Sequence, residues 1–113
     1  MDREMNRRER ENEAQDAFRA FLRCERSGRD PRTPEERAAM VAISVLLCEG
    51  RTGAVDAVRE IYGAHREARG RRGDMESRIL AYIADRYLDR ATVYRWLRMA
   101  RDIYFAVRYP RSE

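Results

Sequence analysis

The stretch Asp89-Arg90-Ala91-Thr92-Val93-Tyr94-Arg95-Trp96-Leu97-Arg98 decides the fold, because it combines a strong helix start with an apolar side and a basic side. Asp89 is a favourable N-cap, since its carboxylate can accept hydrogen bonds from free amide groups of the first turn. Leu88 before the cap and Val93 at the fourth helical position have the spacing of a hydrophobic staple. The sequence therefore predicts a helix that begins directly after Asp89.

This helix is expected to be amphipathic. Apolar residues recur at steps of three and four, which places them on one side of a helix with about 3.6 residues per turn. The expected buried stripe comprises Val93, Trp96, Leu97, Ala100, Ile103, Tyr104 and Val107. The opposite side carries Ala91, Tyr94, Arg95, Arg98, Asp102 and Phe105, with Arg90 and Arg101 at its edge. No acid lies between Arg90 and Arg101 in the sequence, so this side favours an anionic partner.

A second helix is expected directly upstream. Asp74 is a suitable cap for it. Its candidate apolar contacts are Ile79, Leu80, Tyr82, Ile83 and Tyr87. Two helices joined across Leu88-Asp89 make residues 74–108 a candidate helix-turn-helix unit.

The segment Thr92-Val93-Tyr94-Arg95-Trp96-Leu97, with Arg90 and a cap residue before it, resembles the start of the recognition helix in many bacterial and phage regulators. The chain also contains Val58-Arg-Glu-Ile-Tyr62, and its last expected helix ends in Met99-Ala-Arg-Asp-Ile-Tyr-Phe-Ala106. Together these segments resemble small phage transcriptional regulators of the ArpU and RinA type. The resemblance implies a C-terminal helix-turn-helix similar to the promoter-reading region 4 of sigma factors.

Two positions depart from the usual helix-turn-helix pattern. Such units commonly have a small residue in the middle of the first helix and a glycine in the turn. Here these positions hold Ile83 and Tyr87. Either the two helices cross farther apart, or the first helix ends one residue later and the turn is shorter than usual.

Length and composition predict one all-α domain of about five helices over residues 1–113. Of the 113 residues, 39% are charged and 43% hydrophobic, with only three prolines. All 24 basic residues are arginine. Codon bias in a genome rich in G and C would cause this, and guanidinium groups also suit phosphates and guanine edges. The net charge of +4 is a weak argument for nucleic acid by itself.

The arginine excess lies outside the N-terminal part. Residues 1–30 hold eight arginines and eight acids, whereas residues 31–73 and 74–113 each hold eight arginines and six acids. Residues 1–13 are expected to be a charged arm that can fray, followed by a docked helical segment. The next helix is expected to begin at Thr33-Pro-Glu-Glu36 and to be buried on nearly every side from Ala38 to Cys48. A third helix is expected from about Gly53 to Ala68, before the break at Gly70-Arg71-Arg72-Gly73.

Several classes of protein are not expected. The longest apolar run is too short for a membrane span and the N-terminus lacks a signal-peptide core, so we expect a cytoplasmic protein with no membrane partner. Cys24 and Cys48 are expected to be reduced thiols. One histidine, His65, and two distant cysteines lack the spacing of a metal site. With no glycine-rich phosphate loop and no nucleophile with its base, we expect neither an enzyme nor a cofactor.

The sequence therefore predicts a double-stranded DNA-binding protein, and the resemblance implies a transcriptional regulator of a phage or prophage. Tyr94, Arg95 and Arg98 are expected to read the major groove, and Trp96 to belong to the core. Phosphates are expected to be held by Arg90, Arg101, Arg71 and Arg72.

An alternative stays open at this point. A helical protein-interaction module, such as a phage packaging component, an inhibitor or an adaptor, could use Tyr94, Arg98 and Phe105 on the same side. RNA polymerase or another protein is a further candidate partner, and a homodimer is compatible with either function. The sequence specifies neither the DNA target nor the oligomeric state.

Overall fold

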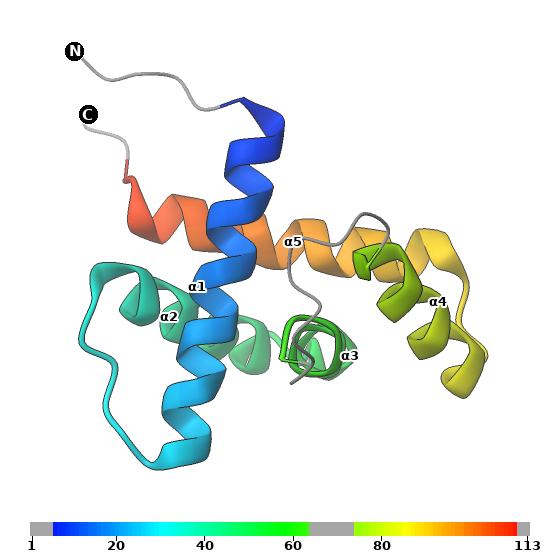
Figure 1. Cartoon of the computed structure of the whole chain (residues 1–113), viewed down its shortest axis with the longest axis horizontal. Coiled ribbons are helices and arrows are strands. Elements are labelled where there is room, and N and C mark those ends of the chain that lie inside the picture. The colour runs from blue at the N-terminus through cyan, green and yellow to red at the C-terminus, as the bar shows by residue number, and fades with distance from the viewer. Residues whose placement is uncertain (1–5, 64–73, 111–113) are drawn as a thin grey trace.

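The computed structural model describes residues 6–63 and 74–110, and within these ranges the chain is helical without any strand (Figure 1). The helices are α1 (Arg7–Ser27), α2 (Pro34–Cys48), α3 (Thr52–Ala57), its π-helical continuation η1 (Val58–Tyr62), α4 (Asp74–Arg86) and α5 (Arg90–Arg108). The predicted all-α architecture of about five helices is confirmed. Over the same residues, no helix is long and apolar enough to cross a membrane.

Helix α1 starts at a capping box that the sequence analysis did not predict. The Asn6 side chain accepts a hydrogen bond from the Glu9 amide at 2.9 Å, and the Glu9 carboxylate accepts one from the Asn6 amide at 3.0 Å. The helix then continues to Ser27 and closes on Gly28, whose φ of 71° is the left-handed conformation that glycine favours. Residues 7–13 of the expected arm are thus helical, and residues 1–5 lie outside the described ranges.

The start of α2 is the one predicted. Thr33 is the N-cap, Pro34 is the first helical residue, and the Thr33 hydroxyl accepts the Glu36 amide at 3.0 Å. The Glu36 carboxylate in turn accepts the amides of Arg32 at 2.8 Å and Thr33 at 3.2 Å. Because these bonds favour the ionised form, they lower the pKa of Glu36 even though its side chain is only 7% exposed.

The sequence predicts that α2 is buried on nearly every side, but in the structure one side of this helix is exposed. It packs mainly against α5 and α1. Its buried residues are Glu36, Ala38, Ala39, Ala42, Ile43 and Leu46. Its other side exposes Val41, Ser44, Leu47 and Cys48. The prediction fails because helices cover only one side of α2 within the described ranges, so an apolar sequence alone did not ensure burial.

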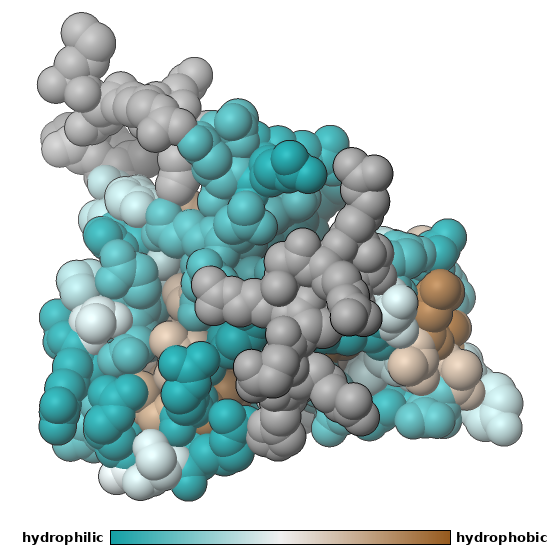
Figure 2. Space-filling view, in the orientation of Figure 1, coloured by the Kyte–Doolittle hydropathy of each residue, from teal (hydrophilic) through white to brown (hydrophobic). Residues whose placement is uncertain are grey.

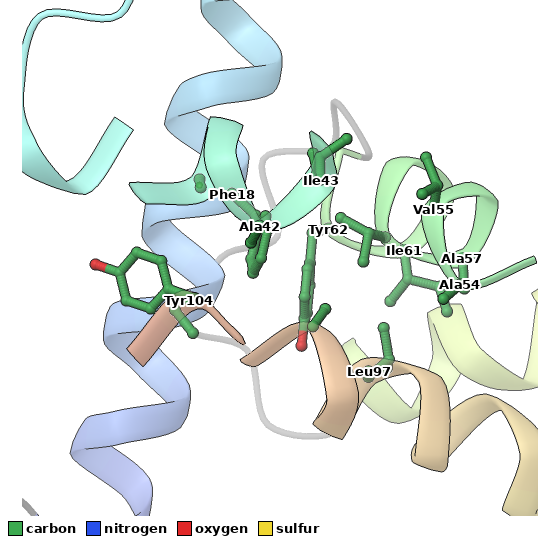
Figure 3. Packing of buried hydrophobic residues seen from close by; sticks show 14 of the residues in the cluster. Phe18, Ala42, Ile43, Ala54, Val55, Ala57, Ile61, Tyr62, Leu97 and Tyr104 are labelled. Carbon is green, nitrogen blue, oxygen red and sulfur yellow. The ribbon is translucent and has the colours of Figure 1, made fainter. Parts of the chain in front are cut away.

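An aromatic cluster holds the centre of the molecule together. Phe18 of α1 stacks on Tyr62 of η1 with ring centroids 5.7 Å apart, and lies 5.9 Å from the ring of Tyr104 of α5. Figure 3 shows Tyr62 and Tyr104 reaching the core from different elements, with Leu97 and Ile61 beside Tyr62. The Tyr104 hydroxyl donates to Glu13 at 2.7 Å, so this buried polar group is satisfied.

The third helix is described through Tyr62. It begins at Thr52, close to the expected start, and changes from α-helical to π-helical geometry at Val58. The remainder of the expected helix, including His65, lies outside the described ranges. No pattern in the sequence predicted the π-helical turn.

Four apolar side chains lie on the other side from that predicted. Phe105 was expected on the open side of α5 but is only 7% exposed, because α1 crosses α5 there and the Arg10 guanidinium lies 4.3 Å from the Phe105 ring centroid. Val107 was expected in the buried stripe but is 36% exposed, although Arg108 beside it reaches Glu35 of α2. Leu80 and Tyr87 of the α4 segment are 48% and 95% exposed, because α4 packs through its other side. Figure 2 shows apolar colour gathering near α4 on a mainly hydrophilic face.

Trp96 packs against the core and is partly buried, in line with its predicted place. The indole lies on the backbone of α3 at Gly53, where an added Cβ atom would come within 2.7 Å of Trp96 Cη2 and 2.8 Å of Cζ2. Because real Cβ atoms do not approach a ring so closely, this contact requires glycine.

We predict that Gly53→Ala destabilises the protein only while the indole is present. Trp96→Ala should lower the free energy of unfolding by up to about 3 kcal/mol, since the ring is only partly buried. In the Trp96→Ala background, Gly53→Ala should be neutral or stabilising by up to about 1 kcal/mol, because alanine favours helix over glycine. Chemical denaturation of the four proteins measures this coupling, and additive losses would contradict the contact.

We also predict an acid-dependent stability that comes from Glu36. Because its folded-state pKa lies below the ordinary value of 4.5, its contribution is present above about pH 4.5 and is lost as pH falls through the folded pKa. Glu36→Gln should therefore destabilise the protein at neutral pH, and its difference from wild type should shrink on acidification. Denaturation across this pH range checks the prediction. Glu49→Gln, an exposed change just after the same helix, is the control that should show a smaller effect.

Candidate nucleic-acid interface

The turn between α4 and α5 keeps the left-handed geometry expected of glycine, although the residue is tyrosine. Helix α4 ends at Arg86, and Tyr87 has a φ of 55° with its side chain in solvent. The Leu88 amide donates to the Ile83 carbonyl at 3.3 Å, which is the bond that closes a Schellman ending. The turn is therefore three residues long, from Tyr87 to Asp89, and is not shortened.

Asp89 caps α5 as predicted. Its carboxylate accepts the Ala91 amide at 2.8 Å and the Thr92 hydroxyl at 3.1 Å. Leu88 packs against the core and Val93 is fully buried, as a hydrophobic staple requires. Helix α4 begins at Asp74, but the expected cap role of this residue falls on a side chain outside the described part of the structure.

One side of α5 is buried and the other is open. The buried residues are Val93, Leu97, Ala100, Tyr104 and Phe105. Ala91, Arg95 and Arg98 are exposed, and Tyr94 is 40% exposed. The open side therefore matches the predicted one over its first three turns and differs at Phe105.

An acid that the sequence analysis did not associate with this side comes from α4. Glu76 forms an ion pair with Arg90 and accepts a hydrogen bond from the Tyr94 hydroxyl. This hydrogen bond raises the pKa of Tyr94, and partial burial acts in the same direction. Glu76 is 14 residues from Arg90 in the sequence, so only the crossing of α4 over α5 could have indicated the pairing.

The arginines of α5 differ in their partners. At the two ends of the helix, Arg90 is paired with Glu76 and Arg108 with Glu35, the latter at 3.2 Å. In the middle, Arg95 and Arg98 are exposed and have no acidic partner within residues 6–63 and 74–110. The free positive charge of α5 is thus concentrated in its central turns.

Arg101 lies at the flank, as predicted, and is partly buried. It interacts with the phenol of Tyr62, whose pKa is raised by burial and pulled in the opposite direction by this guanidinium. Arg71 and Arg72, the other two predicted phosphate contacts, lie outside the described residues.

No metal-ligand set emerges from the described residues, among which no three His, Cys, Asp or Glu side chains gather closely enough to hold an ion. Cys24 is buried in α1, whereas Cys48 is exposed at the end of α2.

Comparison with family models, curated proteins and solved structures found no match for this chain. The function must therefore be argued from the side chains themselves.

We predict that Glu76→Gln lowers the pKa of Tyr94 toward its ordinary value of 10.0, because an amide is a weaker acceptor and carries no charge. An NMR titration of the tyrosine ring carbons measures this pKa. Asp85→Asn removes an exposed acid from the same helix, and should leave Tyr94 unchanged. An equal effect of both substitutions would contradict a specific contact with Glu76.

Proposed function

We propose that the protein binds double-stranded DNA through the open side of α5, with α4 and α5 acting as the two helices of a helix-turn-helix. The observation that carries the proposal is the pair Arg95 and Arg98, both exposed and without acidic partners among the described residues. A helix of this kind fits the major groove of B-form DNA, and arginine is the residue that most often reads guanine there.

The open side suits close approach to base edges. Ala91 lies one turn before Arg95 and its small side chain leaves space for the groove wall. In this proposal Arg95 and Arg98 contact bases, and Tyr94 lies beside them. The buried side, anchored by Val93 and Leu97, holds the helix rigidly enough for such readout.

Phosphate contacts are assigned to the arginines at the flanks. Arg101 lies next to the open side, and Arg90 would exchange part of its pairing with Glu76 for a phosphate. Arg71 and Arg72 remain predicted phosphate contacts from the sequence. Glu76 opposes DNA binding in this arrangement, because its negative charge lies close to the phosphate backbone.

The finer role follows from the resemblance alone. A phage or prophage transcriptional regulator of the ArpU and RinA type would bind promoter DNA, and RNA polymerase is the partner such a role would require. A homodimer would read two half-sites.

The competing function, a protein-interaction module on the same side of α5, has less support. It depended on an exposed aromatic centre formed by Tyr94 and Phe105, with Arg98 beside them. Phe105 is instead 7% exposed beneath Arg10, and the Tyr94 hydroxyl is engaged by Glu76. What remains exposed there is mainly charge, which suits a polyanion better than an apolar protein surface.

The decisive experiment is selection of the purified protein on random duplex DNA, followed by substitution of the central arginines. Arg95→Ala or Arg98→Ala should cost about 1–3 kcal/mol on the selected site and relax the choice of base there. Arg101→Ala should weaken binding to selected and scrambled duplexes alike. It should also lower the slope of log affinity against log salt concentration by about one unit. Binding measured at several salt concentrations separates these effects.

Glu76→Gln gives an independent test in the opposite direction. It removes a negative charge beside Arg90, so affinity for any duplex should rise while the preferred sequence stays the same. Asp85→Asn is again the matched control, with an expected smaller effect. If the wild type shows no affinity for duplex DNA, the proposed function is wrong; if all three arginine substitutions weaken both duplexes equally, the groove-reading assignment is wrong.

A further inference from the structure

A hollow with a volume of about 310 Å³ lies where α1 crosses α5. It is lined by residues of the first turns of α1 and of the central and later turns of α5, namely Arg7, Arg10, Glu11, Arg98, Arg101, Asp102 and Phe105. No residue of the N-terminal segment was assigned a function from the sequence. The hollow therefore adds a group of side chains that the proposed groove-reading side of α5 does not include.

The fold builds this hollow from rigid elements. Figure 1 shows the first turns of α1 rising past α5, so that they form a wall beside it. The capping box of Asn6 and Glu9 keeps these turns helical. Phe105 lines the base of the hollow, almost entirely buried, and the Arg10 guanidinium is held over its ring.

The charges of the hollow favour an anion. Four guanidinium groups and two carboxylates leave a formal excess of two positive charges. One carboxylate, Glu11, lies 3.6 Å from Arg7, and the other, Asp102, belongs to α5. Guanidinium groups that approach from two helices can donate to several oxygens of one phosphate, and the volume is sufficient for such a group.

We propose that this hollow binds one phosphate group of the nucleic-acid backbone, flanking the groove that α5 reads. The inference rests on the proposed function for the source of the phosphate. Arg98 borders both surfaces, since it is exposed on the open side of α5 and also lines the hollow. A duplex that receives Arg95 and Arg98 in its groove therefore has a backbone strand on the flank where Arg7, Arg10 and Arg101 lie.

The test is the salt dependence of duplex binding by the double variant Arg7→Gln, Arg10→Gln. Loss of one phosphate contact should lower the slope of log affinity against log salt by about one unit, so the double variant, which loses the single phosphate of the hollow, should lose up to about one. The base preference obtained by selection should stay unchanged. Arg8→Gln is the matched control, because Arg8 is an exposed neighbour on the same turn and does not line the hollow.

Folding is controlled within the same set. The Arg7 side chain is 86% exposed, so Arg7→Gln alone should leave the thermal midpoint nearly unchanged and still lower the slope, by less than the double variant does. Arg10→Lys keeps the charge over Phe105 and should keep most of the wild-type slope. If the α1 variants match Arg8→Gln in slope while Arg95→Ala still weakens binding, the hollow is not a phosphate site and the proposed function stands.

A second measurement covers the case in which the wild type does not bind duplex DNA. Inorganic phosphate is titrated while NMR follows the guanidinium resonances of Arg98 and Arg101, which are present in both the wild type and the double variant. Shifts that are present in the wild type and absent in the double variant would support a phosphate site although the proposed function had failed. Unshifted resonances, together with the absence of duplex binding, would overturn both the phosphate site and the proposed function.

Discussion

Burial of the apolar side of α5 is the constraint on which the rest of the structure depends. α5 is the only described helix that packs against each of α1, α2, α3 and α4, and its Val93, Leu97, Ala100 and Tyr104 are almost completely removed from water. Burial of apolar side chains is the main favourable contribution to the folding of a chain of this length, and α5 brings together the buried faces of the other helices. It also fixes the rotation of α5 about its own axis. Once Leu97 points into the core, Arg95 and Arg98 must point out of it.

The local part of this outcome could be predicted from the sequence. The caps at Thr33 and Asp89 act on amides within three residues of themselves, so their signals survive whatever the rest of the chain does. The contacts that define the electrostatics of α5 are not local. Glu76 reaches Arg90 and Tyr94 from another helix, and Phe105 is buried by a helix that precedes it by about ninety residues along the chain. Periodicity specifies which side of a helix is apolar, but it does not specify which other helix will cross it.

Tyr87 shows the same limit in the turn. The sequence indicated a departure from the usual glycine, and geometry could have changed to accommodate it. Instead the backbone keeps its left-handed residue, with a φ of 55°. A non-glycine residue there costs about 1–2 kcal/mol in local conformational energy. Three interactions offset that cost: the hydrogen bond from the Leu88 amide to the Ile83 carbonyl, the Asp89 cap and the burial of Val93. The turn is thus determined by the packing of α4 and α5 on either side of it.

Because every Lys or Arg position of the chain is arginine, residue type does not distinguish one cation from another. The arginines differ instead in their acidic partners. Arg59 with Glu25, Arg86 with Asp56 and Arg108 with Glu35 join elements that are distant in sequence, and these pairs serve the fold. Arg95 and Arg98 have no such pairing within the described ranges, and they lie on the helix that packs against each of α1, α2, α3 and α4. A guanidinium group that is buried, or already paired with a carboxylate of its own protein, contributes little to the binding of a polyanion. Arg95 and Arg98, unpaired with any acid of the described ranges, together with the first turns of α1 beside them, are therefore where an anionic partner gains most from binding.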